Sequence, residues 1–111
     1  MYGPLIKKII KRAKREGTID LSFVDDKTIQ ALNRKWRGKD KPTDVLSFNY
    51  NNEGFLGDVI ISAETTKKNA KRYGVPYRDE VKRLVVHGVL HILGYDHGRK
   101  MRNAEKIFEK R

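Results

Sequence analysis

The spacing of apolar and polar residues changes several times along this chain, and each change marks a predicted element. Between Pro4 and Arg15 the apolar residues recur at the spacing of one helical face, which predicts a helix whose other face is rich in lysine. From Thr18 to Val24 apolar and polar residues alternate instead, which is the period of a half-buried strand. The first quarter of the chain is therefore expected to fold as a helix followed by a strand.

The middle of the chain continues this interleaving of helices and strands. Asp25-Asp26 turns the chain and can cap a helix from Lys27 to about Trp36, with Ile29, Leu32 and Trp36 along one face. A basic loop, Gly38 to Thr43, contains Pro42 and is therefore expected to be extended. Two strands follow, Asp44 to Tyr50 and Phe55 to Ser62, and the short Asn-rich turn between them predicts a hairpin.

The last part of the chain is predicted to be helical. Ser62 can cap a basic helix that runs to about Tyr73, where Gly74 and Pro76 end it. The next helix, about Tyr77 to Leu93, is apolar nearly all round, which is typical of a central, buried helix. A short basic helix, Arg99 to Arg111, closes the sequence.

Together these elements predict an α+β fold: a small mixed β-sheet of three or four strands, packed with helices against one buried central helix. At 111 residues the length suits a single domain, residues 1–111. The chain has no cysteine and no apolar run near the roughly 20 residues that span a bilayer. We therefore expect a protein of the cytoplasm without membrane association.

Charge narrows the range of partners. Lysine and arginine number 25 against 14 acidic residues, a formal net charge of +11. Such an excess in so small a domain favours binding to polyanions, nucleic acid first. A heat-adapted protein also carries many charged residues, but that explanation leaves the positive sign unexplained.

The three histidines of the chain predict a metal site. His87 and His91 are four residues apart and so lie on one face of the buried helix. Gly94 can end that helix in a left-handed conformation and let the chain bring His97 back to the same point. Three imidazoles and a water are the ligands of catalytic zinc, whereas structural zinc normally has four protein ligands. Hydrogen-bonded core histidines would be the better interpretation of a lone histidine, but not of three at this spacing.

The same spacing occurs in metzincin metallopeptidases, with one decisive difference. In those enzymes the residue after the first histidine is the glutamate that activates water, and here that residue is Gly88. The shared spacing of the histidines therefore does not imply peptidase activity.

Three segments resemble the motifs of the YbeY family of bacterial metal-dependent endoribonucleases. The run from His87 to His97, HGVLHILGYDH, resembles the family signature H-G-x-L-H-L-x-G-Y-D-H. The segments Trp36–Phe48 and Leu56–Ile61 resemble two further motifs of the family, in the same order. One departure is Asn49, which stands where family members commonly carry proline.

The resemblance implies a hydrolase selective for single-stranded RNA that acts in ribosomal RNA maturation and ribosome quality control. It implies one Zn²⁺ per chain held by His87, His91 and His97, although three imidazoles also suit other divalent transition metals. It further implies that Arg37 is catalytic, where a guanidinium suits the charge that builds up on a phosphate; without the family, a surface arginine at a helix end would be preferred. The partners expected are ribosomal RNA and the small ribosomal subunit or its assembly factors.

The loop after Arg37 adds two candidate contacts, since Lys39 and Lys41 are the cations nearest to it in the basic segment. Two alternatives to an RNA-cleaving enzyme stay open at this point. One is a non-catalytic factor that binds ribosomal RNA and uses the metal for folding; the other is a metallohydrolase of another substrate, such as peptides. An open fourth coordination position argues against the first, and Gly88 and the charge argue against the second.

Overall fold

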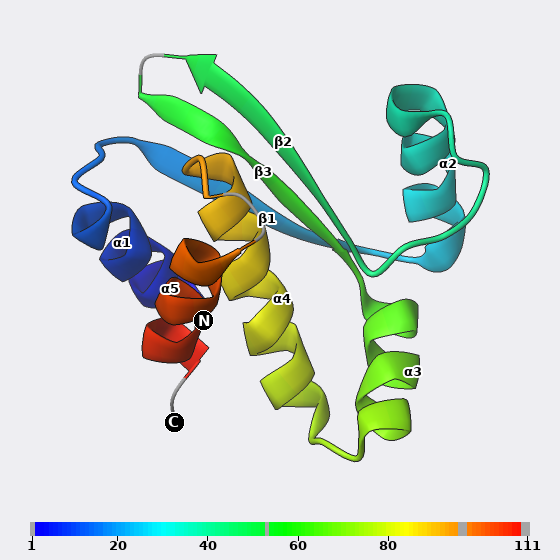
Figure 1. The fold of residues 1–111 in the computed structure, drawn as a ribbon. Helices are drawn as coiled ribbons and strands as arrows, with labels where there is room; N and C mark the ends of the chain where they lie inside the picture. Colours follow the sequence, from blue (N-terminus) through cyan, green and yellow to red (C-terminus); the bar gives the residue numbers. More distant parts are fainter. Residues whose placement is uncertain (1, 53, 96–97, 110–111) are drawn as a thin grey trace.

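The described part of the chain forms a three-stranded mixed sheet and five helices, as predicted for an α+β fold (Figure 1). The computed structural model describes residues 2–52, 54–95 and 98–109. The elements are, in chain order, α1 (Gly3–Arg12), β1 (Thr18–Val24), α2 (Asp26–Arg37), β2 (Val45–Asn52), β3 (Phe55–Ser62), α3 (Ala63–Tyr73), α4 (Tyr77–Ile92) and α5 (Arg99–Glu109).

The sheet has the order β1-β3-β2, so that β3 is central. The strand β1 pairs with β3 in parallel, with Leu21 opposite Val59, and β2 pairs with β3 as an antiparallel hairpin, with Ser47 opposite Val59. The predicted hairpin is therefore confirmed, although β2 continues through Asn52 rather than ending at Tyr50. Both β1 and β2 are edge strands, and β2 is the one that borders the site described below.

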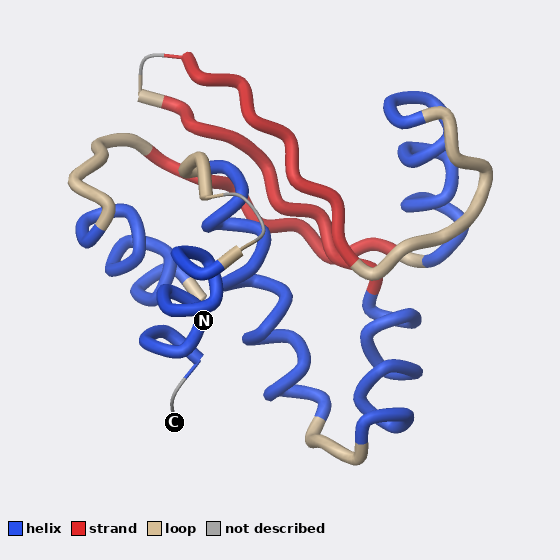
Figure 2. The backbone as a smooth tube through the Cα atoms, in the orientation of Figure 1, coloured by secondary structure: helices blue, strands red, loops and turns tan. Residues whose placement is uncertain are grey.

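The buried helix α4 lies against one face of this sheet, with α1 and α5 on its flank and α3 antiparallel beside it (Figures 1 and 2). Val85, Val86 and Val89 of α4 are fully buried, which confirms the predicted central helix. They belong to a core cluster that also includes Val59 and Ile61 of β3. The helix α2 lies on the other side of the sheet, where its fully buried Ile29 supplies the apolar contact.

Two glycines let α4 approach the sheet closely. A Cβ atom on Gly88 of α4 would lie 2.7 Å from Cγ1 of Val59 on β3. A Cβ atom on Gly57 of β3 would lie 3.1 Å from side-chain carbons of Ile92 on α4, and it would also clash with the carbonyl oxygen of Phe48 on the neighbouring strand. A side chain at either glycine would therefore hold α4 and the sheet further apart, and its absence lets the backbone of one element meet side chains of the other. This close packing brings the histidine-bearing end of α4 next to β2.

Polar caps fix the ends of the helices that border the sheet. Asp25 caps α2 by accepting a hydrogen bond from the Thr28 amide, and Ser62 caps α3 by accepting one from the Thr65 amide. Both caps were among the predicted positions. Asp26 then ties the two helices together, because its carboxylate accepts hydrogen bonds from the hydroxyls of both Ser62 and Thr65.

Two expectations about burial are wrong. The helical spacing predicts Trp36 on the apolar face of its helix, but Trp36 is 61% exposed. The helix ends at the margin of the sheet, so that no further element covers its last turn. The alternation from Thr18 to Val24 predicts that Phe23 lies on the buried side of β1 with the other apolar residues. Phe23 is instead 45% exposed near the end of that edge strand, where it contacts only the ring of Tyr2 among the described aromatic rings. Among the described residues, no helix is both long and apolar enough to cross a membrane.

Candidate active site

A cavity of about 300 Å³ lies where β2 meets the C-terminal half of α4, and three of the predicted site residues, Arg37, His87 and His91, line it. Its lining comes from three elements: the last residue of α2, alternate residues of β2, and one face of α4. The lining residues are Arg37, Val45, Ser47, Asn49, His87, His91 and Ile92. Arg37 and the two histidines are fifty residues apart in sequence, and only the fold brings them together.

His87 and His91 lie on successive turns of α4, as their spacing predicts. Their ring centroids are 4.7 Å apart and their planes are inclined at 76°. Both rings border the same cavity, so two imidazoles are available to one ligand. Gly94 follows the helix with a φ of +94°, which confirms the predicted positive φ at this turn.

The third predicted ligand, His97, and the neighbouring Asp96 lie outside the described residues. Within the described residues, no group of three or more histidine, cysteine, aspartate or glutamate side chains that could hold a metal is found. The fit to a metal therefore depends on the chemistry of His87 and His91.

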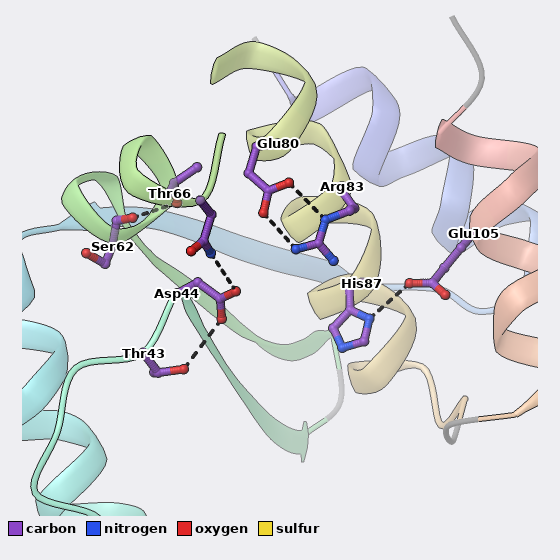
Figure 3. A network of polar contacts seen from close by, with 9 residues as sticks. Thr43, Asp44, Ser62, Thr66, Glu80, Arg83, His87 and Glu105 are labelled. Carbon is purple, nitrogen blue, oxygen red and sulfur yellow. Dashed lines mark hydrogen bonds and ion pairs between the residues drawn. The ribbon is translucent and has the colours of Figure 1, made fainter. Parts of the chain in front are cut away.

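Glu105 of α5 contacts the imidazole ring of His87. Its Oε2 lies 3.0 Å from Nδ1 of His87, and the two side chains are 19% and 23% exposed (Figure 3). Because a carboxylate only accepts hydrogen bonds, the contact requires a proton on Nδ1, and in that tautomer of the neutral imidazole Nε2 is the atom that can bind a metal. Metal-binding histidines commonly have such an acceptor behind them, so the donor set fits a divalent transition metal.

Arg37 is the final residue of α2, and Gly38 ends the helix in a left-handed conformation with a φ of +69°. The side chain crosses to the edge strand, where Nη2 donates to the carbonyl oxygen of Ser47 at 3.5 Å. This long contact uses one of the five N–H donors of the guanidinium, and the residue also lines the cavity.

Lys39 and Lys41 are exposed on the loop that follows Arg37, and neither lines the cavity. The loop is tied back to α2: the side-chain amide of Asn33 donates to the carbonyl oxygen of Lys41 at 2.9 Å, and Asp40 contacts Arg34 at 3.6 Å. The structure therefore does not bring the two lysines into the cavity itself.

Sequence analysis missed three residues at the site. Ser47 donates through Oγ to the carbonyl oxygen of Gly88 at 3.3 Å, and Asn49 donates through Nδ2 to the carbonyl oxygen of Ile92 at 3.1 Å. Both lie with Val45 at every second position of β2, and this strand period was the signal that could have identified them. No local pattern in the sequence identifies Glu105, because it reaches His87 only through the packing of α5 across α4.

Asn49 takes part in a direct contact between β2 and α4. The strand continues past this position, with Asn49 opposite Gly57. The Asn49 side chain satisfies a carbonyl of the last turn of α4, which has no partner within the helix. The strand and the histidine-bearing helix are thus joined directly beside the cavity.

Comparison with known proteins identifies the family. Residues 2–111 match the family described as Endoribonuclease YbeY. The chain belongs to the YbeY endoribonuclease family. The prediction of a YbeY-family endoribonuclease, an enzyme that hydrolyses RNA, is therefore confirmed.

Individual YbeY relatives support the assignment along most of the chain. The chain is 46% identical to the endoribonuclease YbeY of Persephonella marina over 110 residues, covering 93% of this chain and 72% of the relative. It is 45% identical to that of Aquifex aeolicus over 95 residues, covering 82% of this chain and 63% of the relative. The chain thus spans about two thirds to three quarters of these two YbeY proteins.

A solved structure has the same fold. A Thermotoga maritima protein determined in solution superposes with a TM-score of 0.73 at 28% sequence identity, covering 96% of this chain and 75% of that protein. The α+β architecture is therefore shared with a measured structure.

Proposed function

We propose that this chain is a metal-dependent endoribonuclease that cuts single-stranded RNA in the cavity between β2 and α4. The observation that carries the proposal is the meeting of Arg37 with His87 and His91 in that one cavity. A cationic donor beside two imidazoles suits a reaction in which negative charge builds up on a phosphate.

The proposed cofactor is one Zn²⁺ per chain, held by His87, His91 and His97, with another divalent transition metal as a possible substitute. When bound, zinc supplies a Lewis acid and lowers the pKa of a coordinated water to about 7. The support for this site is the shared cavity of the two described histidines and the carboxylate of Glu105 behind His87.

The chain's own residues then have separate tasks. Arg37 binds the phosphate oxygens of the strand, and its planar fork orients them in a way that a lysine ammonium does not. Glu105 orients His87, while Ser47 and Asn49 hold β2 to α4 and so fix the width of the cavity. Lys39 and Lys41 attract the phosphates on either side.

The proposed substrate is ribosomal RNA, met in the cytoplasm on the small ribosomal subunit or in complex with assembly factors. The net charge of +11 supports a polyanionic substrate. A peptide substrate is disfavoured by the structure as well as by the sequence, because the position of the peptidase glutamate is occupied by Gly88 in contact with Val59.

The test is to incubate metal-loaded protein with single-stranded RNA, duplex RNA and casein, each with and without a chelator. We expect cleavage of single-stranded RNA alone and its loss on chelation. Metal analysis of the His87→Ala, His91→Ala and His97→Ala variants should give well below one equivalent per chain. Cleavage that survives complete metal removal, or full metal content in His97→Ala, contradicts the proposed site.

A further inference from the structure

Trp36, the single tryptophan of the chain, is the most exposed large apolar side chain of the described residues, at 61%. It lies at the end of α2, immediately before Arg37. An indole has one of the largest apolar surfaces of any side chain, and leaving it in water is unfavourable unless a partner covers it.

The indole is held in place by its neighbours. The ring of Phe48 meets it edge-on, with centroids 6.4 Å apart and planes inclined at 70°. The ammonium of Lys35 lies 5.1 Å from the ring centroid, a cation–π contact. These two contacts orient the ring while leaving most of its surface exposed.

The position of this aromatic pair is linked to the cavity through adjacent residues. Arg37 contacts Ser47 and lines the cavity, whereas Trp36 contacts Phe48. Since successive residues of a strand point to opposite faces, Phe48 lies across the edge of β2 from Ser47. A strand of nucleic acid that leaves the cavity over this edge therefore reaches Trp36 next.

The surroundings of Trp36 are cationic. Arg34, Lys35, Arg37, Lys39 and Lys41 are all exposed in this part of the chain. Asp40 is the one acidic residue of the segment from 34 to 43, and it is paired with Arg34. An aromatic ring among cations is the arrangement that proteins use to bind single strands, with bases stacked on rings and phosphates near the charges.

We propose that Trp36 is a stacking platform for an unpaired base of the RNA, next to the phosphate bound by Arg37. This inference rests on the proposed function and adds a source for its strand preference. A base within a duplex is already stacked and paired, so its face is not available to the indole. Stacking on Trp36 therefore favours single strands without reading their sequence.

The single tryptophan makes the contact directly measurable. Intrinsic fluorescence is followed as metal-loaded protein is titrated with a short 2′-O-methyl RNA strand, a strand of the same phosphate number without bases, and a duplex. We expect quenching by the strand that carries bases and little by the other two. Trp36→Ala should bind the base-carrying strand about 5- to 150-fold more weakly, the range of one base–aromatic stack.

Tyr73 supplies the matched control. It is 58% exposed and follows Lys71 and Arg72 at the end of α3, but it does not line the cavity. Tyr73→Ala should leave binding unchanged, Trp36→Phe should restore part of it, and Trp36→Ala should keep the wild-type affinity for the base-free strand and the wild-type metal content.

Saturating binding without a change in fluorescence, or equal affinity of Trp36→Ala and wild type for the base-carrying strand, overturns the stacking role. If either result is obtained while the wild-type protein still cleaves single-stranded RNA, only this inference fails and the proposed function stands. If the wild type cleaves no RNA at all, the proposed function fails, while the quenching still reports whether bases stack on Trp36. Quenching by an apolar peptide but not by RNA would assign the surface to a protein partner and also overturn the inference.

Discussion

Oε2 of Glu105 lies 3.0 Å from Nδ1 of His87, although the two residues belong to different helices and are 18 positions apart. The contact connects α5 to a histidine that lines the cavity between β2 and α4. It also gives His87 a fixed orientation, which a metal ligand needs for high affinity.

Glu105→Ala should therefore weaken zinc binding about tenfold to a hundredfold, the usual effect of losing a carboxylate behind a metal-bound histidine. Glu105→Gln retains an acceptor without the charge and should fall between alanine and wild type. The measurement is competition with a chromophoric zinc chelator. Glu16→Ala, at an exposed glutamate outside the cavity lining, is the control; unchanged zinc affinity in Glu105→Ala would argue against the positioning role.

Arg37→Ala should lower the rate of RNA cleavage by about a hundredfold to a thousandfold, by analogy with removing one donor to a developing oxyanion. Arg37→Lys should restore little of it, because the paired hydrogen bonds are lost. The contact of Arg37 with Ser47 is long, so thermal unfolding should stay close to wild type. Lys27→Ala, at the other end of α2, should cleave normally. Near-complete activity in Arg37→Ala would show that Arg37 is a surface arginine without a catalytic role.

Gly88→Ala should lower the free energy of unfolding by about 1–3 kcal/mol, the cost of overpacking a core. The added methyl would lie 2.7 Å from Val59, which is fully buried on the central strand and stiff at χ1. This clash outweighs the gain of about 1 kcal/mol that alanine brings to a helix. Urea unfolding gives the comparison. Gly3→Ala, with no atom near its Cβ, is the control, and a stabilised Gly88→Ala protein would show that the helix can move away from the sheet.

Replacing Lys39 and Lys41 by alanine should weaken RNA binding at low salt and make it less dependent on salt. Each phosphate contact to a single strand contributes about 0.7 to the slope of log affinity against log salt, so the double variant should lose up to about 1.4. Titrations at several salt concentrations measure this slope. Lys67→Ala, an exposed lysine on α3, should keep the wild-type slope; an unchanged slope in the double variant would place the RNA elsewhere.

Acid should weaken the junction of α2 and α3. Hydrogen bonds from Ser62 and then Thr65 lower the pKa of Asp26 below its usual value. A carboxylate with a lowered folded-state pKa stabilises the protein above its unfolded-state pKa of about 3.9, and the contribution is lost as pH falls through the folded-state pKa. The difference in unfolding free energy between wild type and Asp26→Asn should therefore be constant near neutral pH and shrink below about pH 4. Asp20→Asn, at an exposed residue of β1, is the control. A difference in unfolding free energy that grows in acid would contradict this linkage.

The sequence by itself determined the order and type of the elements. Periodicity and caps act between neighbouring residues, and for this reason the predicted ranges of β1, β3 and α3 agree with the structure. The same local reasoning placed His87 and His91 on one helical face, since four residues make about one turn. Family motifs added Arg37 as a candidate, which no spacing rule would have selected.

Only the tertiary structure decided which of these residues meet. The approach of α4 to β2 places Ser47 and Asn49 at the cavity, and the packing of α5 across α4 places Glu105 behind His87. The end of α2 at the margin of the sheet leaves Trp36 exposed, against its helical pattern. Each of these outcomes depends on contacts between elements distant in sequence, and a local pattern carries no information about which element will cover a given face.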